Sequence, residues 1–175
     1  MLNHKRALQF IAVLTMLFTL TACASLLIGN RIQGAILNAV FTQLVGKSPD
    51  QLLEDSRIQD RLRPLLGDNY DPAMKLLKTA REVQREGALF YVASRYAPDE
   101  VKGVLNTAAM VYNADTNQMA VMLLGGDKPE IIGEQPTDGG FLEPLLPTEL
   151  KTAYDQALAI KNNPLIDSAT QLLQE

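Results

Sequence analysis

The single cysteine of the chain, Cys23, lies where its thiol can be covalently modified. It ends the segment Leu20-Thr21-Ala22-Cys23, which follows a basic start, Asn3-His4-Lys5-Arg6, and the apolar run 7–20. That run of 14 residues has the length of a secretory signal and is shorter than the ~20 residues that a membrane span needs. The pattern predicts that residues 1–22 are a signal peptide and that the mature chain begins at Cys23.

Small and apolar residues directly before such a cysteine are typical of bacterial lipoproteins. The Cys23 thiol would carry a diacylglycerol and its amine a further acyl chain, and several chains give the stable anchoring that one chain cannot. A signal anchor with an incidental cysteine is the alternative. Ala24 follows, and not the aspartate that retains lipoproteins in the inner membrane of enteric bacteria. Resemblance to known lipoproteins therefore implies an outer-membrane anchor, with the domain facing the periplasm.

The predicted processing removes the residue types on which many catalytic sites depend. His4, the only histidine, leaves with the signal, and the only cysteine becomes the lipid attachment point. Residues 24–175 can then form no Ser-His-Asp triad, no Cys-His pair and no zinc site of the usual His/Cys type. An enzyme that uses carboxylates alone stays open in principle, but no pair of acids is marked by its surroundings. We expect a protein that binds, without cofactor or metal.

The composition predicts a folded and acidic mature protein. Apolar residues make up 47% of the chain, enough for a packed core in one domain. Loss of Lys5 and Arg6 leaves 14 basic against 20 acidic residues, a net charge of −6. This charge disfavours nucleic acid and suits a basic protein partner, although a contribution to solubility alone is the simpler explanation of it.

The mature chain begins with an apolar segment in place of a polar tether. Residues 25–45 are predicted to form an amphipathic helix that ends at Gly46, with Arg31 among the polar residues that disfavour a second membrane span. The helix would either lie in the membrane interface or against a partner, or pack on the domain. We expect residues 23–46 to form the anchor and helix, and residues 47–175 a single domain.

The remaining pattern predicts an α+β domain, with a small antiparallel sheet flanked by helices. Ser48 and Pro49 favour a helix at 49–65, with Leu65 on its buried side and Arg61 mostly solvated. A cluster of turn residues follows, and residues 74–85 fit a helix or a strand. Further elements are strands at 88–93, 107–112 and 118–124, an edge strand at 129–133, a helix from Thr148 to Ile160 and a short helix at 165–173.

Several features between residues 48 and 135 resemble, in order and spacing, the inhibitor of vertebrate lysozyme (Ivy) family. They are Gly67-Asp68-Asn69-Tyr70-Asp71-Pro72-Ala73, a strand with Tyr91, a loop from Tyr96 to Val101, and Asn117-Gln118-Met119. In that family the loop reads Cys-Lys-Pro-His-Asp-Cys, is closed by a disulfide and enters the active cleft of a lysozyme. Here neither cysteine is present, and Asp99 stands at the position of the histidine.

The resemblance implies that the same loop contacts a lysozyme-like enzyme. The expected contact residues are Tyr96, Pro98, Asp99, Glu100 and Lys102. A charged connection that is merely solvated is the simpler interpretation of this loop, as it is for the oxygen-bearing cluster at 68–71, which lacks the glycine and glutamate of a calcium loop. An accessory lipoprotein that assists an envelope or secretion complex through the helix at 25–45 is the alternative function.

Overall fold

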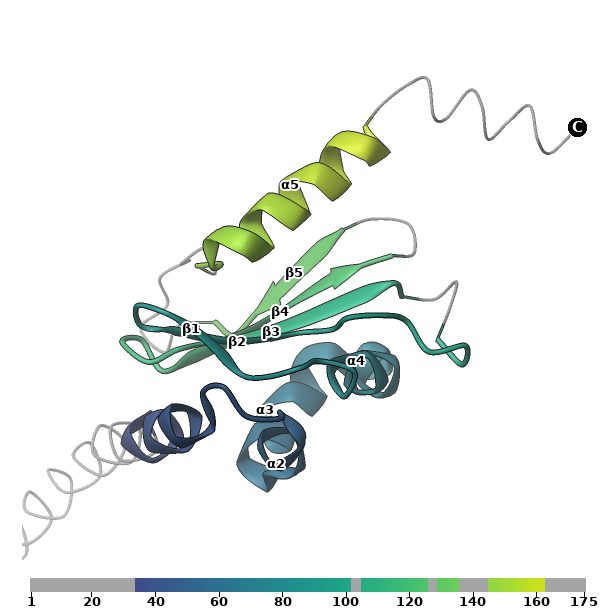
Figure 1. Cartoon of the computed structure of the whole chain (residues 1–175). Helices are drawn as coiled ribbons and strands as arrows, with labels where there is room; N and C mark the ends of the chain where they lie inside the picture. The colour runs from purple at the N-terminus through teal and green to yellow at the C-terminus, as the bar shows by residue number, and fades with distance from the viewer. Residues whose placement is uncertain (1–33, 102–104, 126–128, 136–144, 163–175) are drawn as a thin grey trace, which may run out of the picture. The chain divides into compact units, whose positions relative to one another are not determined.

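The computed structural model describes residues 34–101, 105–125, 129–135 and 145–162 (Figure 1). Cys23, Lys102 and the predicted helix at 165–173 lie outside them. The chain divides into two compact units, 1–39 and 40–175, and the second contains the sheet and the helices that pack on it. Residues 34–44 are helical, and Gly46 follows with a φ of 75°, a conformation that glycine adopts readily.

A five-stranded antiparallel sheet forms the centre of the second unit, and its strands lie side by side in chain order. The predicted α+β class, with a small antiparallel sheet and flanking helices, is thereby confirmed. The strands are β1 (Gln84–Glu86), β2 (Leu89–Ala93), β3 (Thr107–Asn113), β4 (Gln118–Leu124) and β5 (Glu130–Gly133).

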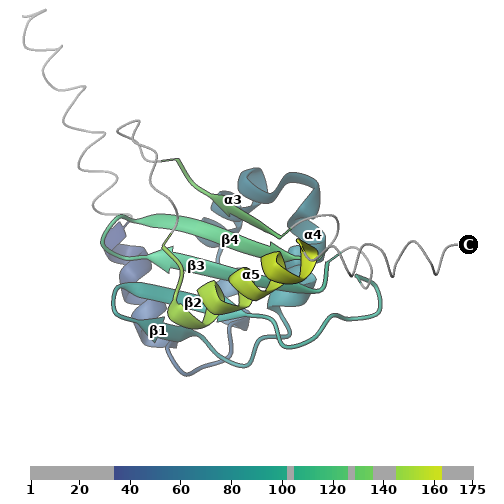
Figure 2. The same ribbon diagram turned by 90° about the horizontal axis from the view of Figure 1, so that it is seen from above.

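Helices cover both faces of this sheet. On one face lie α2 (Asp50–Glu54), α3 (Ser56–Leu66) and α4 (Tyr70–Leu77), with the short 3₁₀ helix η1 (Gly67–Asn69) between the last two (Figure 1). On the other face lies α5 (Thr148–Lys161), which crosses the middle strands (Figure 2). Near-continuous burial of β3 and β4 follows from this double cover, because both of their faces meet apolar side chains.

Three aromatic rings form the centre of the core on the α2–α4 side. Phe41 stacks on Tyr112 with ring centroids 4.6 Å apart, and Phe90 lies 5.5 Å from Phe41. All three are fully buried, and Leu44 is buried as well. Aromatic pairs at such distances stabilise a core beyond the area that they bury. Phe41 and Leu44 therefore belong to the hydrophobic core of the second unit.

The predicted helix at 49–65 is in fact two helices, α2 and α3. Asp55 has extended backbone between them (φ −66°, ψ 121°) and accepts a hydrogen bond from the Arg57 amide as the N-cap of α3. An aspartate that bonds the backbone ahead of it competes with a continuous helix. The break also changes which leucine is buried: Leu66 lies in the core and Leu65 is only half-buried, contrary to the prediction.

The segment with two predicted alternatives, residues 74–85, contains parts of two elements. Helix α4 begins earlier than expected, at Tyr70, and accommodates Pro72 in its first turn, where a proline costs no helical hydrogen bond. Strand β1 then pairs with β2 through a turn at Gly87, whose φ is 61°. The side chains of β1 are polar, so only the pairing with β2 identifies it as a strand.

Helix α5 is fixed to the sheet mainly at its N-terminal end. The Glu86 carboxylate of β1 accepts hydrogen bonds from the Thr148 amide (3.0 Å) and the Thr148 hydroxyl (2.8 Å), and so caps the first turn of α5. Leu150 is buried against the sheet, whereas Ile160 near the other end is 60% exposed. The hydroxyl of Tyr91 lies beneath this helix, and burial, with lesser effects of Glu149 and Glu86, raises its pKa.

Candidate functional site

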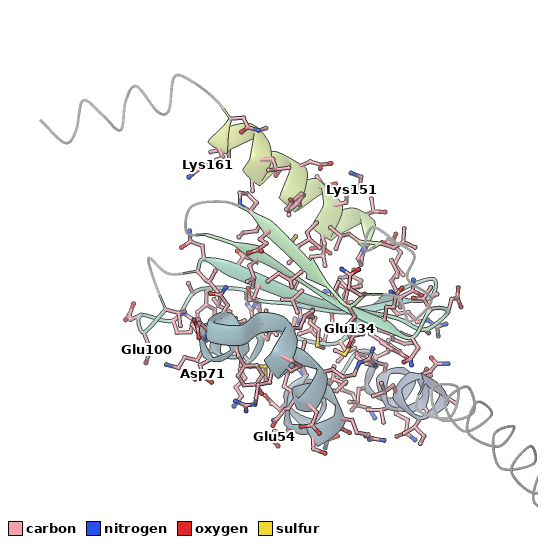
Figure 3. All side chains as sticks on the ribbon, turned by 180° about the vertical axis from the view of Figure 1, so that it is seen from behind. Glu54, Asp71, Glu100, Glu134, Lys151 and Lys161 are labelled. Atoms are coloured by element: carbon pink, nitrogen blue, oxygen red, sulfur yellow. The ribbon has the colours of Figure 1, made fainter. Side chains whose placement is uncertain are left out.

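The connection between β2 and β3 carries the predicted contact residues at one end of the sheet (Figure 3). Tyr96 is 63% exposed, and Asp99 and Glu100 are exposed. Pro98 is half-buried, and Lys102 lies outside the described residues. The structure therefore places an aromatic side chain and two carboxylates on the surface of one loop.

The base of this loop continues the hydrogen bonding of the sheet. The Ser94 amide donates to the Ala108 carbonyl (2.9 Å), and the Ala108 amide donates to the Ser94 hydroxyl (3.0 Å). On the other side the Asn106 amide donates to the Leu124 carbonyl (2.8 Å). Gly125 is required here, because a Cβ at this position would lie 2.6 Å from the Asn106 nitrogen. Both ends of the loop are thus tied to neighbouring strands.

A hydroxyl from a different element contacts the first residues of the loop. Thr79 follows the last turn of α4, and its hydroxyl accepts a hydrogen bond from the Arg95 amide at 3.1 Å. The same oxygen lies 3.2 Å from the Tyr96 carbonyl and 2.7 Å from the Leu76 carbonyl. A hydroxyl donates one hydrogen at a time and has two acceptor sites, so these contacts are compatible. Thr79 was not recognised in the sequence.

The tip of the loop is a tight turn around the two carboxylates. The Val101 amide donates to the Pro98 carbonyl (3.0 Å), which places Asp99 and Glu100 at the two central positions of the turn. The Val101 side chain is 1% exposed, and the Leu105 amide donates to the Val101 carbonyl (3.1 Å). A buried valine directly after the acids fixes the direction in which the tip projects.

A second polar cluster lies at the opposite end of the strands. Arg61 of α3 makes a two-pronged contact with Glu134, just after β5: its Nε donates to Oε1 at 2.7 Å and its Nη2 to Oε2. Arg61 Nη2 also donates to the Asn117 carbonyl (2.7 Å), and Nη1 lies 3.3 Å from Asn117 Oδ1. Bidentate pairs of this kind are among the stronger polar contacts in proteins. Arg61 is half-buried, which corrects its prediction as a solvated residue.

Backbone and tyrosine groups complete this Arg61 network. The Met119 amide donates to Glu134 Oε2 (2.8 Å), and the Tyr112 hydroxyl donates to Asn117 Oδ1 (3.2 Å). Burial raises the pKa of Tyr112, an effect that the nearby Arg61 charge partly offsets. Asn117 turns the chain from β3 to β4 with a φ of 53°. The network therefore links α3, the β3–β4 turn and the end of β5, and so stabilises the fold.

Within the described part of the chain, no three His, Cys, Asp or Glu residues gather in a group that could hold a metal ion, and the cluster at 68–71 is not such a group. Nor is any helix there both long and apolar enough to cross a membrane. Comparison with protein-family models, with curated proteins and with solved structures found no match. The described residues of the β2–β3 loop present one exposed aromatic side chain, Tyr96, and two exposed carboxylates, Asp99 and Glu100.

Proposed function

We propose that the protein is a lipid-anchored binding protein of the bacterial cell envelope, whose β2–β3 loop binds and inhibits a lysozyme-like muramidase. One observation carries the proposal: the loop exposes Tyr96, Asp99 and Glu100 between anchors that are buried or hydrogen-bonded. A loop that is ordered before binding loses less conformational entropy when it binds. The collinear resemblance to the Ivy family supports a lysozyme as the partner.

The chemistry of the loop suits a protein partner. An exposed tyrosine gives a rigid, amphipathic contact with few rotatable bonds, and such residues dominate the affinity of many interfaces. Asp99 and Glu100 add negative charge beside it, which steers a basic partner toward the loop and weakens with salt. Binding that depends on Tyr96 for affinity and on the acids for association rate is the expected behaviour.

The position of Asp99 distinguishes two modes of contact. If the tip enters the catalytic cleft, Asp99 approaches the catalytic carboxylates of the lysozyme, and like charges repel. If the tip rests on a basic outer surface, Asp99 is attracted. Asp99→Asn should therefore tighten binding in the first mode and weaken it in the second. Glu100→Gln removes the neighbouring negative charge and shows whether the effect is specific to position 99.

The lipid anchor would restrict where this loop acts. Phe41 is fixed in the core and follows Cys23 by 18 positions, so even a fully extended chain between them reaches about 60 Å. The domain would then stay close to the membrane surface. Fractionation of cells that express wild-type protein or Cys23→Ser tests this part: the wild type should sediment with outer membranes, and the variant should not. Equal membrane recovery would contradict lipidation at Cys23.

The functional test is inhibition of cell-wall lysis by the full-length protein in detergent. Vertebrate lysozyme and other lysozyme types are assayed at low and physiological salt, with Pro98-Asp99-Glu100 replaced by Gly-Ser-Gly in the matched variant. Wild type should inhibit with a Kd below about 1 µM, stronger at low salt, and the variant should not. Failure of the wild type to inhibit or bind any of these enzymes would contradict the proposal.

Assembly of an envelope complex is the second candidate. Ile36 is 42% exposed on the helical segment 34–44, an apolar side chain available to a partner protein. Ile36→Ser should then remove a crosslinked envelope partner without affecting the loop. If crosslinking patterns of this variant and the wild type are the same, the helix does not have this function.

A further inference from the structure

We infer that Thr79 is a positioning residue that orders the tip of the β2–β3 loop from outside the loop itself. The connection between β2 and β3 is 13 residues long, Ser94 to Asn106. A connection of this length without a covalent cross-link samples many conformations unless other contacts restrain it. The Thr79 hydroxyl, just after the end of helix α4, provides such a restraint, because it forms hydrogen bonds with the backbone of Arg95 and Tyr96.

Thr79 itself is held rigidly. Its amide donates to the Leu76 carbonyl (2.9 Å) in the last turn of α4, and its hydroxyl lies 2.7 Å from that carbonyl. Leu76 and Leu77, directly before it, are fully buried. The hydroxyl therefore occupies a position set by the core, and the loop adapts to it.

The contacts of this hydroxyl come immediately before the exposed tip. The Arg95 amide donates to it, and the Tyr96 carbonyl lies within hydrogen-bond distance. Restraint of these two residues fixes where the chain leaves the sheet, and buried Val101 fixes where it returns. Between these two points only Ala97 to Glu100 remain, and the turn closed by the Val101 amide accommodates them.

In a variant without the Thr79 hydroxyl, Arg95 and Tyr96 lose this restraint, and the turn that follows them is held mainly by Val101. The equilibrium constant for opening of the turn should rise roughly threefold to tenfold, the factor that corresponds to the free energy of one hydrogen bond. The effect on a partner rests on the proposed function: a less ordered loop should bind more slowly. The order of the loop in the free protein does not depend on that function.

Amide hydrogen exchange of the free full-length protein tests the inference. In Thr79→Val the Arg95 amide loses its acceptor directly, so the informative amides are those of Val101 and Leu105, which Thr79 does not contact. Their exchange should be roughly threefold to tenfold faster than in the wild type. Thr79→Ser keeps the hydroxyl and should restore slow exchange. Thr152→Val removes a hydroxyl that donates to the Thr148 carbonyl within α5, and should leave both amides unchanged.

Two outcomes would overturn the inference. One is unchanged exchange at Val101 in Thr79→Val. The other is an equal acceleration at Val121 in the middle of β4, because that would show a global loss of stability instead of local loop opening. Lysozyme binding is measured separately on the same proteins: if the wild type binds no lysozyme, the proposed function fails, while the exchange data still decide the role of Thr79.

Discussion

The β2–β3 loop and the Arg61 network are polar regions at opposite ends of the sheet, and they differ in how far their side chains are exposed. In the network, Arg61 donates hydrogen bonds to Glu134 and to Asn117 in the β3–β4 turn, and Glu134 also accepts one from the Met119 amide. In the loop, hydrogen bonds hold the backbone, while Tyr96 and Glu100 extend from it to the surface. Both regions are held by hydrogen bonds, but Tyr96 of the loop is 63% exposed, whereas the Arg61 and Glu134 side chains are 21% and 24% exposed.

This difference separates residues that hold the fold from residues that are available for function. Polar side chains that satisfy one another across distant segments stabilise the structure, and their loss leaves buried groups without partners. Polar side chains at an exposed turn contribute little to stability, so their types are free to serve binding. Variants in the two regions should accordingly differ in which property they change.

The largest expected effect on stability follows from Arg61→Ala. The substitution removes the bidentate contact to Glu134 and the bonds to Asn117, and leaves the partly buried Glu134 carboxylate without its cation. Chemical denaturation should show a loss of about 2–3 kcal/mol in the free energy of unfolding. Arg63→Ala, which removes a cation over the Tyr70 ring at 4.2 Å, is the matched control and should cost less than about 1 kcal/mol. Equal losses would contradict the structural role of the network.

Tyr96→Ser should show the opposite behaviour. Tyr96 is 63% exposed, so the free energy of unfolding should change by less than about 0.5 kcal/mol. If the proposed function holds, lysozyme binding should weaken at least tenfold, because an exposed aromatic residue at an interface is a common source of affinity. Denaturation and a binding titration on the same sample check both parts. A large loss of stability would mean that Tyr96 belongs to the fold.

Glu86→Ala should have an effect of intermediate size on the free energy of unfolding. Its carboxylate caps the first turn of α5 through two hydrogen bonds, and loss of a cap costs about 1 kcal/mol. Glu130→Ala, at an exposed position of β5, is the control and should leave the free energy of unfolding unchanged within about 0.5 kcal/mol. A Glu86 variant as stable as this control would show that α5 does not depend on the cap.

The smallest effect is a change in alkaline stability. Burial raises the pKa of Tyr112 in the folded protein, so the unfolded chain loses this proton first, near pH 10. Stability from Tyr112 is therefore fully present below pH 10 and decreases as the pH rises toward the folded pKa. Tyr112→Phe should therefore reduce the loss of stability above pH 10, measured by chemical denaturation of the variant and the wild type across this pH range. Identical pH profiles of the two proteins would contradict the burial argument.

Local pattern was sufficient to predict most of the sheet. The apolar segments of β2, β3 and β4, and the turn residues between Asn113 and Gln118, indicated the central meander directly. Strand β1 has no such pattern and exists through its pairing with β2. The break at Asp55 was equally hidden, because an aspartate inside a helical pattern can be either a solvated helix residue or, as here, the N-cap of a new helix.

The candidate site was predictable in part for the same reason. Proline and acids marked the loop from Tyr96 to Val101, and its chemistry is local to those residues. The partners that hold it and the opposite cluster are not local: Thr79 lies 16 residues before Arg95, and Arg61 lies 73 residues before Glu134. No spacing rule connects residues so far apart, and only the folded arrangement of α3, α4 and the sheet brings them together.

Lysozyme affinity, measured side by side for three full-length proteins, tests the central claim most directly. They are the wild type, the variant with Pro98-Asp99-Glu100 replaced by Gly-Ser-Gly, and Arg61→Lys. The account predicts a Kd below about 1 µM for the wild type, at least tenfold weaker binding by the loop variant, and unchanged binding by Arg61→Lys at a temperature where it stays folded. No binding by the wild type, or equal binding by the wild type and the loop variant, would contradict the claim that the β2–β3 loop is the functional surface.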